Sequence, residues 1–68
     1  MPTIMVFCRD VYSMDQRRAF IKGVCDATVE SLRVRPEQVT IRVIRSGDED
    51  ISRGGVFRID MPNHGDPV

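Results

Sequence analysis

The sequence predicts an α/β fold, a single βαβ unit followed by a short hairpin, and three patterns carry that prediction. Residues 1–8 and 39–45 are apolar segments of strand length, and alternate side chains of a strand point to opposite faces. Between them, apolar residues recur every three or four positions, as in an amphipathic helix. Gly54-Gly55 then interrupts a short apolar stretch, which is a turn or hairpin signal. A strand, a crossover helix and a second strand almost always pair in parallel with a right-handed connection.

The first strand is apolar on both of its faces. One face carries Ile4, Val6 and Cys8, and the other carries Thr3, Met5, Phe7 and Arg9. A helix of the same chain covers only one face, so we expect a second chain on the other. The length of 68 residues supports this, because a domain of about 60 residues buries only roughly 60% of its unfolded surface and is marginally stable alone.

The helix is predicted to begin at Ser13, which forms a capping box with Gln16, and to end before Pro36. Its apolar stripe consists of Phe20, Ile21, Val24, Ala27, Thr28 and Leu32. Gly23 inside the helix indicates close packing against a neighbouring backbone. In the second strand, Val39, Ile41 and Val43 should face the helix. Thr40, Arg42 and Ile44 should then share the opposite face with Thr3, Met5 and Phe7.

Composition excludes several function classes. Ten Lys plus Arg balance ten Asp plus Glu, which argues against binding to nucleic acid or to a membrane surface through net charge. No apolar run reaches the roughly 20 residues of a membrane span, and no secretory signal opens the chain, so we expect a cytoplasmic protein. Cys8 and Cys25 have no metal-ligand spacing and are expected to be small core residues, so no metal is predicted. His64 lies in a tail without periodicity and is expected to be solvated.

Pro2 is the candidate catalytic residue. If Met1 is removed, the chain starts with the secondary amine of a pyrrolidine ring, which is both a nucleophile and a base. A chain-terminal amine titrates at about 7.7–8.0, and an apolar wall lowers that pKa by disfavouring the charged form, so the amine could act as a base near neutrality. The alternative is that Pro2 merely follows a start codon in a frayed end.

The Met-Pro start, the βαβ unit of nearly forty residues, the turn containing Pro36 and the late Gly54-Gly55 hairpin together resemble the 4-oxalocrotonate tautomerase family. The resemblance implies one tautomerase-like domain over 1–68, with a core at 2–60 and a tail at 61–68. It also implies a hexamer built from dimers, in which two βαβ units pair into a four-stranded sheet. The amino-terminal proline would be the catalytic group at the contacts between subunits.

The resemblance also assigns site positions, and three of four carry a changed side chain. Pro2 matches. The family's carboxylate-binding arginines, one before the helix and one at the start of the second strand, correspond to Tyr12 and Thr40. The hairpin aromatic that lowers the dielectric around the proline corresponds to Ile51. Arg42, two residues after Thr40 on the same face, is the first candidate for a replacement cation, and the others are Arg9, Arg45 and Arg53. Tyr12 is either a hydrogen-bond donor or an interface residue.

Several functions follow. The first is a tautomerase in which neutral Pro2 moves the enol proton of a small 2-hydroxydienoate or enolpyruvate to carbon, with no cofactor. A variant resembles the chloroacrylate dehalogenases, in which the proline is cationic and a carboxylate activates water; Asp10, Asp48 or Asp50 would supply it. The second is a supporting subunit of a heterohexamer with a homologous chain. The third is a binding module without chemistry.

Overall fold

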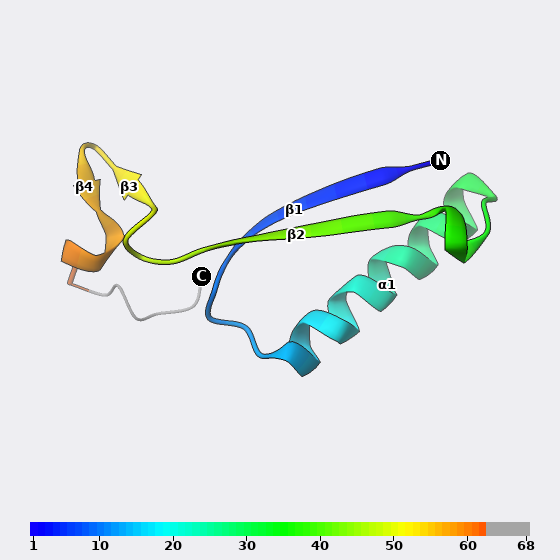
Figure 1. The fold of residues 1–68 in the computed structure, drawn as a ribbon, viewed down its shortest axis with the longest axis horizontal. Helices are drawn as coiled ribbons and strands as arrows, with labels where there is room; N and C mark the ends of the chain where they lie inside the picture. The colour runs from blue at the N-terminus through cyan, green and yellow to red at the C-terminus, as the bar shows by residue number, and fades with distance from the viewer. Residues whose placement is uncertain (63–68) are drawn as a thin grey trace.

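The structure is a computed structural model that describes residues 1–62; His64 and the rest of the tail lie outside this range. The elements in chain order are β1 (Thr3–Arg9), α1 (Met14–Leu32), the 3-10 turn η1 (Pro36–Gln38), β2 (Thr40–Ser46), β3 (Ser52–Arg53), β4 (Val56–Phe57) and the 3-10 turn η2 (Arg58–Asp60). Figure 1 shows this order as a βαβ unit with a hairpin beyond it, which confirms the predicted fold class.

β1 and β2 pair in parallel, in a register that runs from Thr3 opposite Thr40 to Arg9 opposite Ser46. Backbone hydrogen bonds extend the pairing at both ends. The Thr40 amide donates to the Pro2 carbonyl at 3.0 Å, and the Asp10 amide donates to the Ser46 carbonyl at 3.0 Å. The amino end of the chain is therefore tied to the second strand, as a terminus held in a sheet should be.

The ends of α1 follow from the local sequence. The Ser13 hydroxyl accepts a hydrogen bond from the Gln16 amide at 3.1 Å, and the Gln16 side chain accepts one from the Ser13 amide at 2.8 Å, which confirms the capping box. At the other end Arg33 adopts the left-handed conformation, with φ 57°, and its amide donates to the Val29 carbonyl. The helix thus stops ahead of Pro36.

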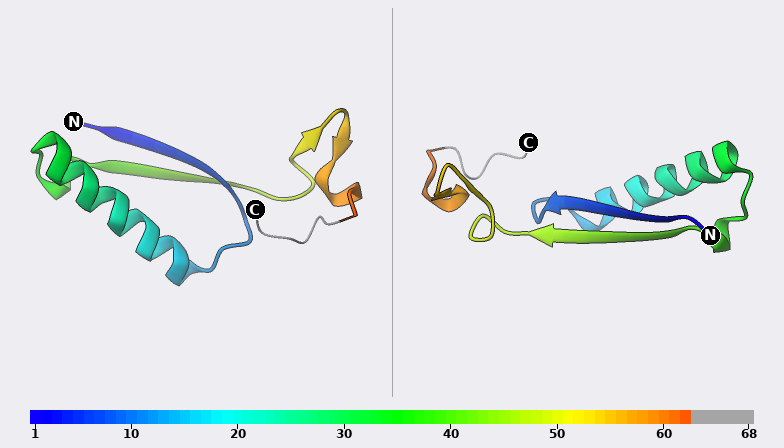
Figure 2. Two further views of the ribbon diagram at one scale, coloured as in Figure 1. Left: turned by 180° about the vertical axis from the view of Figure 1, so that it is seen from behind. Right: turned by 90° about the horizontal axis from the view of Figure 1, so that it is seen from above.

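The helix covers one face of the two strands and leaves the other open (Figure 2). Ile4, Val6 and Cys8 are half-buried, whereas Thr3, Met5 and Phe7 between them are exposed, which confirms the predicted alternation. We call the open side the outer face; it consists of Thr3, Met5, Phe7, Thr40, Arg42 and Ile44.

The part of the chain that the structure describes has no closed core of its own. Within residues 1–62 no hydrophobic side chain is fully buried, and on the outer face Met5 is 56% and Phe7 72% exposed. The Cα radius of gyration is 15.2 Å, against about 11 Å for a compact domain of this length. An open face and an extended shape are expected of a subunit that completes its core with other chains.

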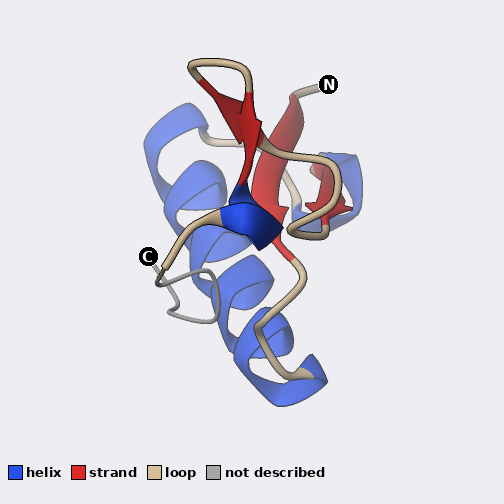
Figure 3. Ribbon diagram, turned by 90° about the vertical axis from the view of Figure 1, so that its left-hand side faces the viewer, coloured by secondary structure: helices blue, strands red, loops and turns tan. Residues whose placement is uncertain are grey.

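The hairpin is an arm that extends past the carboxyl end of β2, at the opposite end from the amino terminus (Figure 1), and Figure 3 views the molecule from the hairpin end. Gly54 and Gly55 have φ of +62° and +81°, and two such residues make the turn type that matches the twist of a two-residue hairpin loop. Ser52 pairs with Phe57 and Arg53 with Val56. We call residues 52–60 the hairpin arm.

Four smaller expectations need correction or restatement. A Cβ added at Gly23 would meet nothing within 4 Å, so the chain itself does not make the expected close packing. Cys8 and Cys25 are free thiols and only half-buried, because the single chain has no core to receive them. Arg17, a charged residue of the helix outside the predicted apolar stripe, is also half-buried. Over residues 1–62, no helix is both long and apolar enough to cross a membrane.

Candidate active site

The amino-terminal end of the parallel strands brings Pro2 and Thr40 together. Pro2 is half-buried directly before β1, and its carbonyl accepts the hydrogen bond from the Thr40 amide. Thr40 is exposed and opens β2. The backbone around the proline ring is therefore fixed by the sheet, which keeps a catalytic group in one position better than a free end would.

Arg42 lies on the same outer face, in register with Met5, and is exposed. Its nearest neighbours on the face are apolar or uncharged, Met5 beside it and Thr40 two residues earlier on its strand. Within the described residues no salt bridge uses its guanidinium. A cation in this position is available to a carboxylate that approaches the proline end of the face.

Tyr12 and Ile51 lie at the other end of the strand pair. Tyr12 follows the carboxyl end of β1, and Ile51 stands just before β3, where its carbonyl accepts a hydrogen bond from the Arg58 amide at 2.7 Å. With a rise of about 3.3 Å per residue, the length of β1 separates them from Pro2 by about 20 Å. One chain thus brings Pro2, Thr40 and Arg42 together but not Tyr12 or Ile51.

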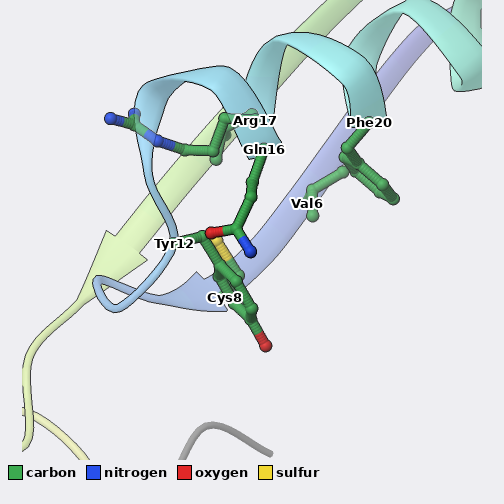
Figure 4. Close-up of a pocket in the computed structure, with 7 residues that line it drawn as sticks. Val6, Cys8, Tyr12, Gln16, Arg17 and Phe20 are labelled. Carbon is green, nitrogen blue, oxygen red and sulfur yellow. The ribbon is translucent and has the colours of Figure 1, made fainter.

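A cavity of about 290 Å³ opens at the Tyr12 end, between α1 and the inner face of the sheet. Figure 4 shows Tyr12, Gln16 and Cys8 gathered on one side of it and Phe20 and Val6 on the other. Its lining is mainly apolar and consists of Val6, Cys8, Tyr12, Gln16, Arg17, Phe20 and Val43. Sequence reasoning placed Tyr12 near a site but missed Gln16 and Arg17. Both lie in the first turn of α1, within five residues of Tyr12, and this nearness in sequence was the available signal.

The carboxylates proposed for a dehalogenase-like reaction are largely engaged. Asp48 forms an ion pair with Arg9, with 2.9 Å between Asp48 Oδ1 and Arg9 Nη2. Asp50 accepts a hydrogen bond from the Gly47 amide at 3.2 Å. Asp10 is exposed, and its Oδ2 lies 3.2 Å from the position that a Cβ on Gly47 would occupy. Arg9 is buried in this pair. Its guanidinium is therefore not available on the outer face, where the alternation of the strand predicted it.

Among residues 1–62 no group of three or more His, Cys, Asp and Glu side chains is placed to hold a metal ion. The groups near Pro2 are instead hydroxyl, guanidinium and backbone donors, from Thr40, Arg42 and the first strand. Such groups can bind a carboxylate and stabilise an oxyanion.

Among solved structures, the chain is similar to one of the 4-oxalocrotonate tautomerase isozymes from Methylibium petroleiphilum, with a TM-score of 0.75 and 30% identity over 82% of this chain and 88% of that one. It is also similar in fold to YwhB, a homologue of 4-oxalocrotonate tautomerase, with a TM-score of 0.79 and 18% identity over 88% of this chain and 98% of that one. No family model and no curated protein matches the sequence.

These likenesses define the class of protein first: a short βαβ chain of the tautomerase type. The 30% identity over most of both chains then settles the family. The chain belongs to the 4-oxalocrotonate tautomerase family.

Proposed function

We propose that the protein is a tautomerase that uses the amine of Pro2 as a general base, after removal of Met1, on a small 2-hydroxydienoate or enolpyruvate. The observation that carries the proposal is the placement of Pro2. The residue is half-buried, its carbonyl is held by the Thr40 amide at 3.0 Å, and the chain belongs to a family of tautomerases.

The reaction needs two proton transfers, one from the substrate to the proline and one from the proline back to the substrate. Neutral Pro2 takes the proton of the enol hydroxyl, the carbonyl forms as the double bond shifts, and the proline ammonium returns the proton to carbon. Arg42 binds the substrate carboxylate by a charge-assisted hydrogen bond. The Thr40 hydroxyl, beside Pro2 on the second strand, is placed to donate to the same carboxylate or to the developing oxyanion. No cofactor takes part in these steps.

The complete site draws on more than one chain. Tyr12 and Ile51 lie about 20 Å from Pro2 within one chain, so they act at the proline only if another copy presents its carboxyl strand end there. Two chains paired through their sheets, in a homohexamer of dimers, would provide such a contact and would cover the outer face. In this assembly Ile51 of one copy forms an apolar wall beside Pro2 of another, and Tyr12 is a donor at the same contact.

Kinetics of purified wild type and Pro2→Ala test the proposal. Alanine leaves a primary amine without the fixed geometry of the ring, so ketonisation of 2-hydroxymuconate or phenylenolpyruvate should slow by at least about tenfold. The assembly should keep its mass. In wild type, kcat/KM should rise with pH as the amine loses its proton. Equal rates for the two proteins would overturn the assignment of Pro2.

A supporting subunit of a heterohexamer is the second candidate, because Tyr12 and Thr40 replace the two arginines that a carboxylate-binding site of this family uses. Under that function the pure chain shows no turnover that depends on Pro2, and activity appears when a homologous chain bearing the arginines is added. A dehalogenase would differ in its pH profile, since a cationic proline makes activity fall as pH rises.

A further inference from the structure

One ion pair in the described chain is much less exposed to solvent than the others and joins residues far apart in sequence. It joins Arg9, the last residue of β1, to Asp48 in the loop after β2, and the two side chains are only 9% and 17% exposed. Arg9 is the one buried residue within 1–62. The other pairs each join near neighbours in sequence and have side chains at least 63% exposed: Arg18 with Asp15, Lys22 with Asp26, and Arg35 with Glu37.

The loop that holds Asp48 is also the base of the hairpin arm. The Ile59 amide donates to the Asp48 carbonyl at 3.1 Å, and the Arg58 amide donates to the Ile51 carbonyl at 2.7 Å. Asp48 is thus bound to the sheet through its side chain and to the arm through its backbone. Ile51, three residues after Asp48, is also bonded to the arm, through the hydrogen bond that its carbonyl accepts from the Arg58 amide.

The arm cannot set its own orientation by packing. Its strands have two residues each, and an isolated hairpin of two strands is marginally stable in water. Val56 is 46%, Phe57 49% and Ile59 42% exposed, so close to half of each of these apolar residues is not packed against the chain. The backbone hydrogen bond to Asp48 is therefore a contact through which the ion pair can fix the angle between arm and sheet.

We propose that Arg9 and Asp48 are positioning residues that hold the hairpin arm and Ile51 in the orientation in which they reach the active site of a neighbouring copy. The pair is suited to this because it is nearly removed from solvent, so breaking it leaves a charge without its partner in a buried place. The role in catalysis rests on the proposed function, whereas the orientation of the arm does not.

Hydrogen exchange of the arm amides in Arg9→Met tests the positioning directly. Exchange at the Arg58 and Ile59 amides should become about tenfold faster or more, while the amides of α1 keep their rates. Arg9→Lys, which retains the charge, should restore most of the protection. Asp48→Asn removes the other partner with little change of shape and should loosen the same amides. Unchanged exchange at both amides in Arg9→Met and Asp48→Asn would overturn the proposal.

Lys22→Met is the matched control. The Lys22 and Asp26 side chains also lie 2.9 Å apart but are 76% and 65% exposed, and the hydrogen bond with Asp26 raises the pKa of Lys22. Removing a solvated pair of this kind has little effect on stability. If Lys22→Met accelerated exchange in the arm as much as Arg9→Met, the effect would be a general loss of stability and the assignment to Arg9 would be wrong.

Steady-state kinetics of the same variants then test whether the orientation of the arm affects catalysis. With a loosened arm, kcat should fall by more than KM rises, and the rising limb of the pH profile should move to higher pH because water reaches the Pro2 amine. A loosened arm with wild-type kinetics and pH profile would overturn the catalytic role. Wild type without any turnover would instead overturn the proposed function, and the exchange rates would still decide the positioning.

Discussion

Phe7 is the residue whose replacement tests the assembly most severely. It lies at the carboxyl end of the outer face, opposite Ile44 in the strand pair, and is 72% exposed in the single chain. We predict that Phe7→Asp dissociates the assembly, because it removes apolar contact area and places a carboxylate in the interface.

The magnitude follows from the exposed area. An aromatic side chain buries roughly 200 Å², of which 72% is still exposed here, so association would cover roughly 140 Å² per chain. At about 25 cal/mol per Å² this contributes roughly 3.5 kcal/mol per subunit. A loss of that size weakens association by roughly 300-fold, and the unpaired buried carboxylate weakens it further.

Sedimentation velocity over a range of protein concentrations measures the effect. Wild type should sediment as an oligomer at micromolar concentrations, and Phe7→Asp as a smaller species. Met14→Asp is the control, because Met14 is also an exposed apolar residue, 49% exposed, but begins α1, where a carboxylate is favourable. If Phe7→Asp sedimented like wild type, the outer face would not be the interface and the area argument would fail.

Two further substitutions give predictions with different readouts. Arg42→Ala should raise KM for a carboxylate substrate by roughly tenfold to a hundredfold, the loss of a hydrogen bond to a charged group, with the assembly mass unchanged; an unaltered KM would remove Arg42 from the site. Gly23→Ala should stabilise the protein by about 0.5–1 kcal/mol in urea unfolding, because alanine favours a helix and nothing lies within 4 Å of the new Cβ. A loss of stability there would show that another chain packs against Gly23.

The elements that local physics determines could be predicted from the sequence. Ser13 and Gln16 form the capping box that begins α1, the predicted alternation of β1 matches the burial of its residues from Thr3 to Cys8, and Gly54-Gly55 forms the hairpin turn. Each of these depends on a few neighbouring residues and on the period of the element. The parallel pairing of the strands followed from the crossover helix between them.

The arrangement of the candidate site could be predicted only in part. Pro2 and Thr40 come together because Pro2 directly precedes β1 and Thr40 begins β2, and the sequence pattern indicated that these two strands pair in parallel. The pairing of Arg9 with Asp48 joins residues far apart in sequence, and the alternation of β1 alone placed Arg9 with the exposed side chains of the outer face. The cavity beside Tyr12 depends on how α1 sits over the strands, which periodicity does not specify.

The central claim is that the mature chain starts at Pro2 and works within an assembly, and native mass spectrometry of the purified protein tests both parts at once. We expect the mass of an oligomer whose subunits lack Met1, in a number that fits a hexamer built from dimers. In the proposed site, removal of Met1 would free the secondary amine, and assembly would supply Tyr12 and Ile51 from other copies. A monomer that retains Met1 would contradict the account, because its Pro2 nitrogen would be an amide and could not act as a base.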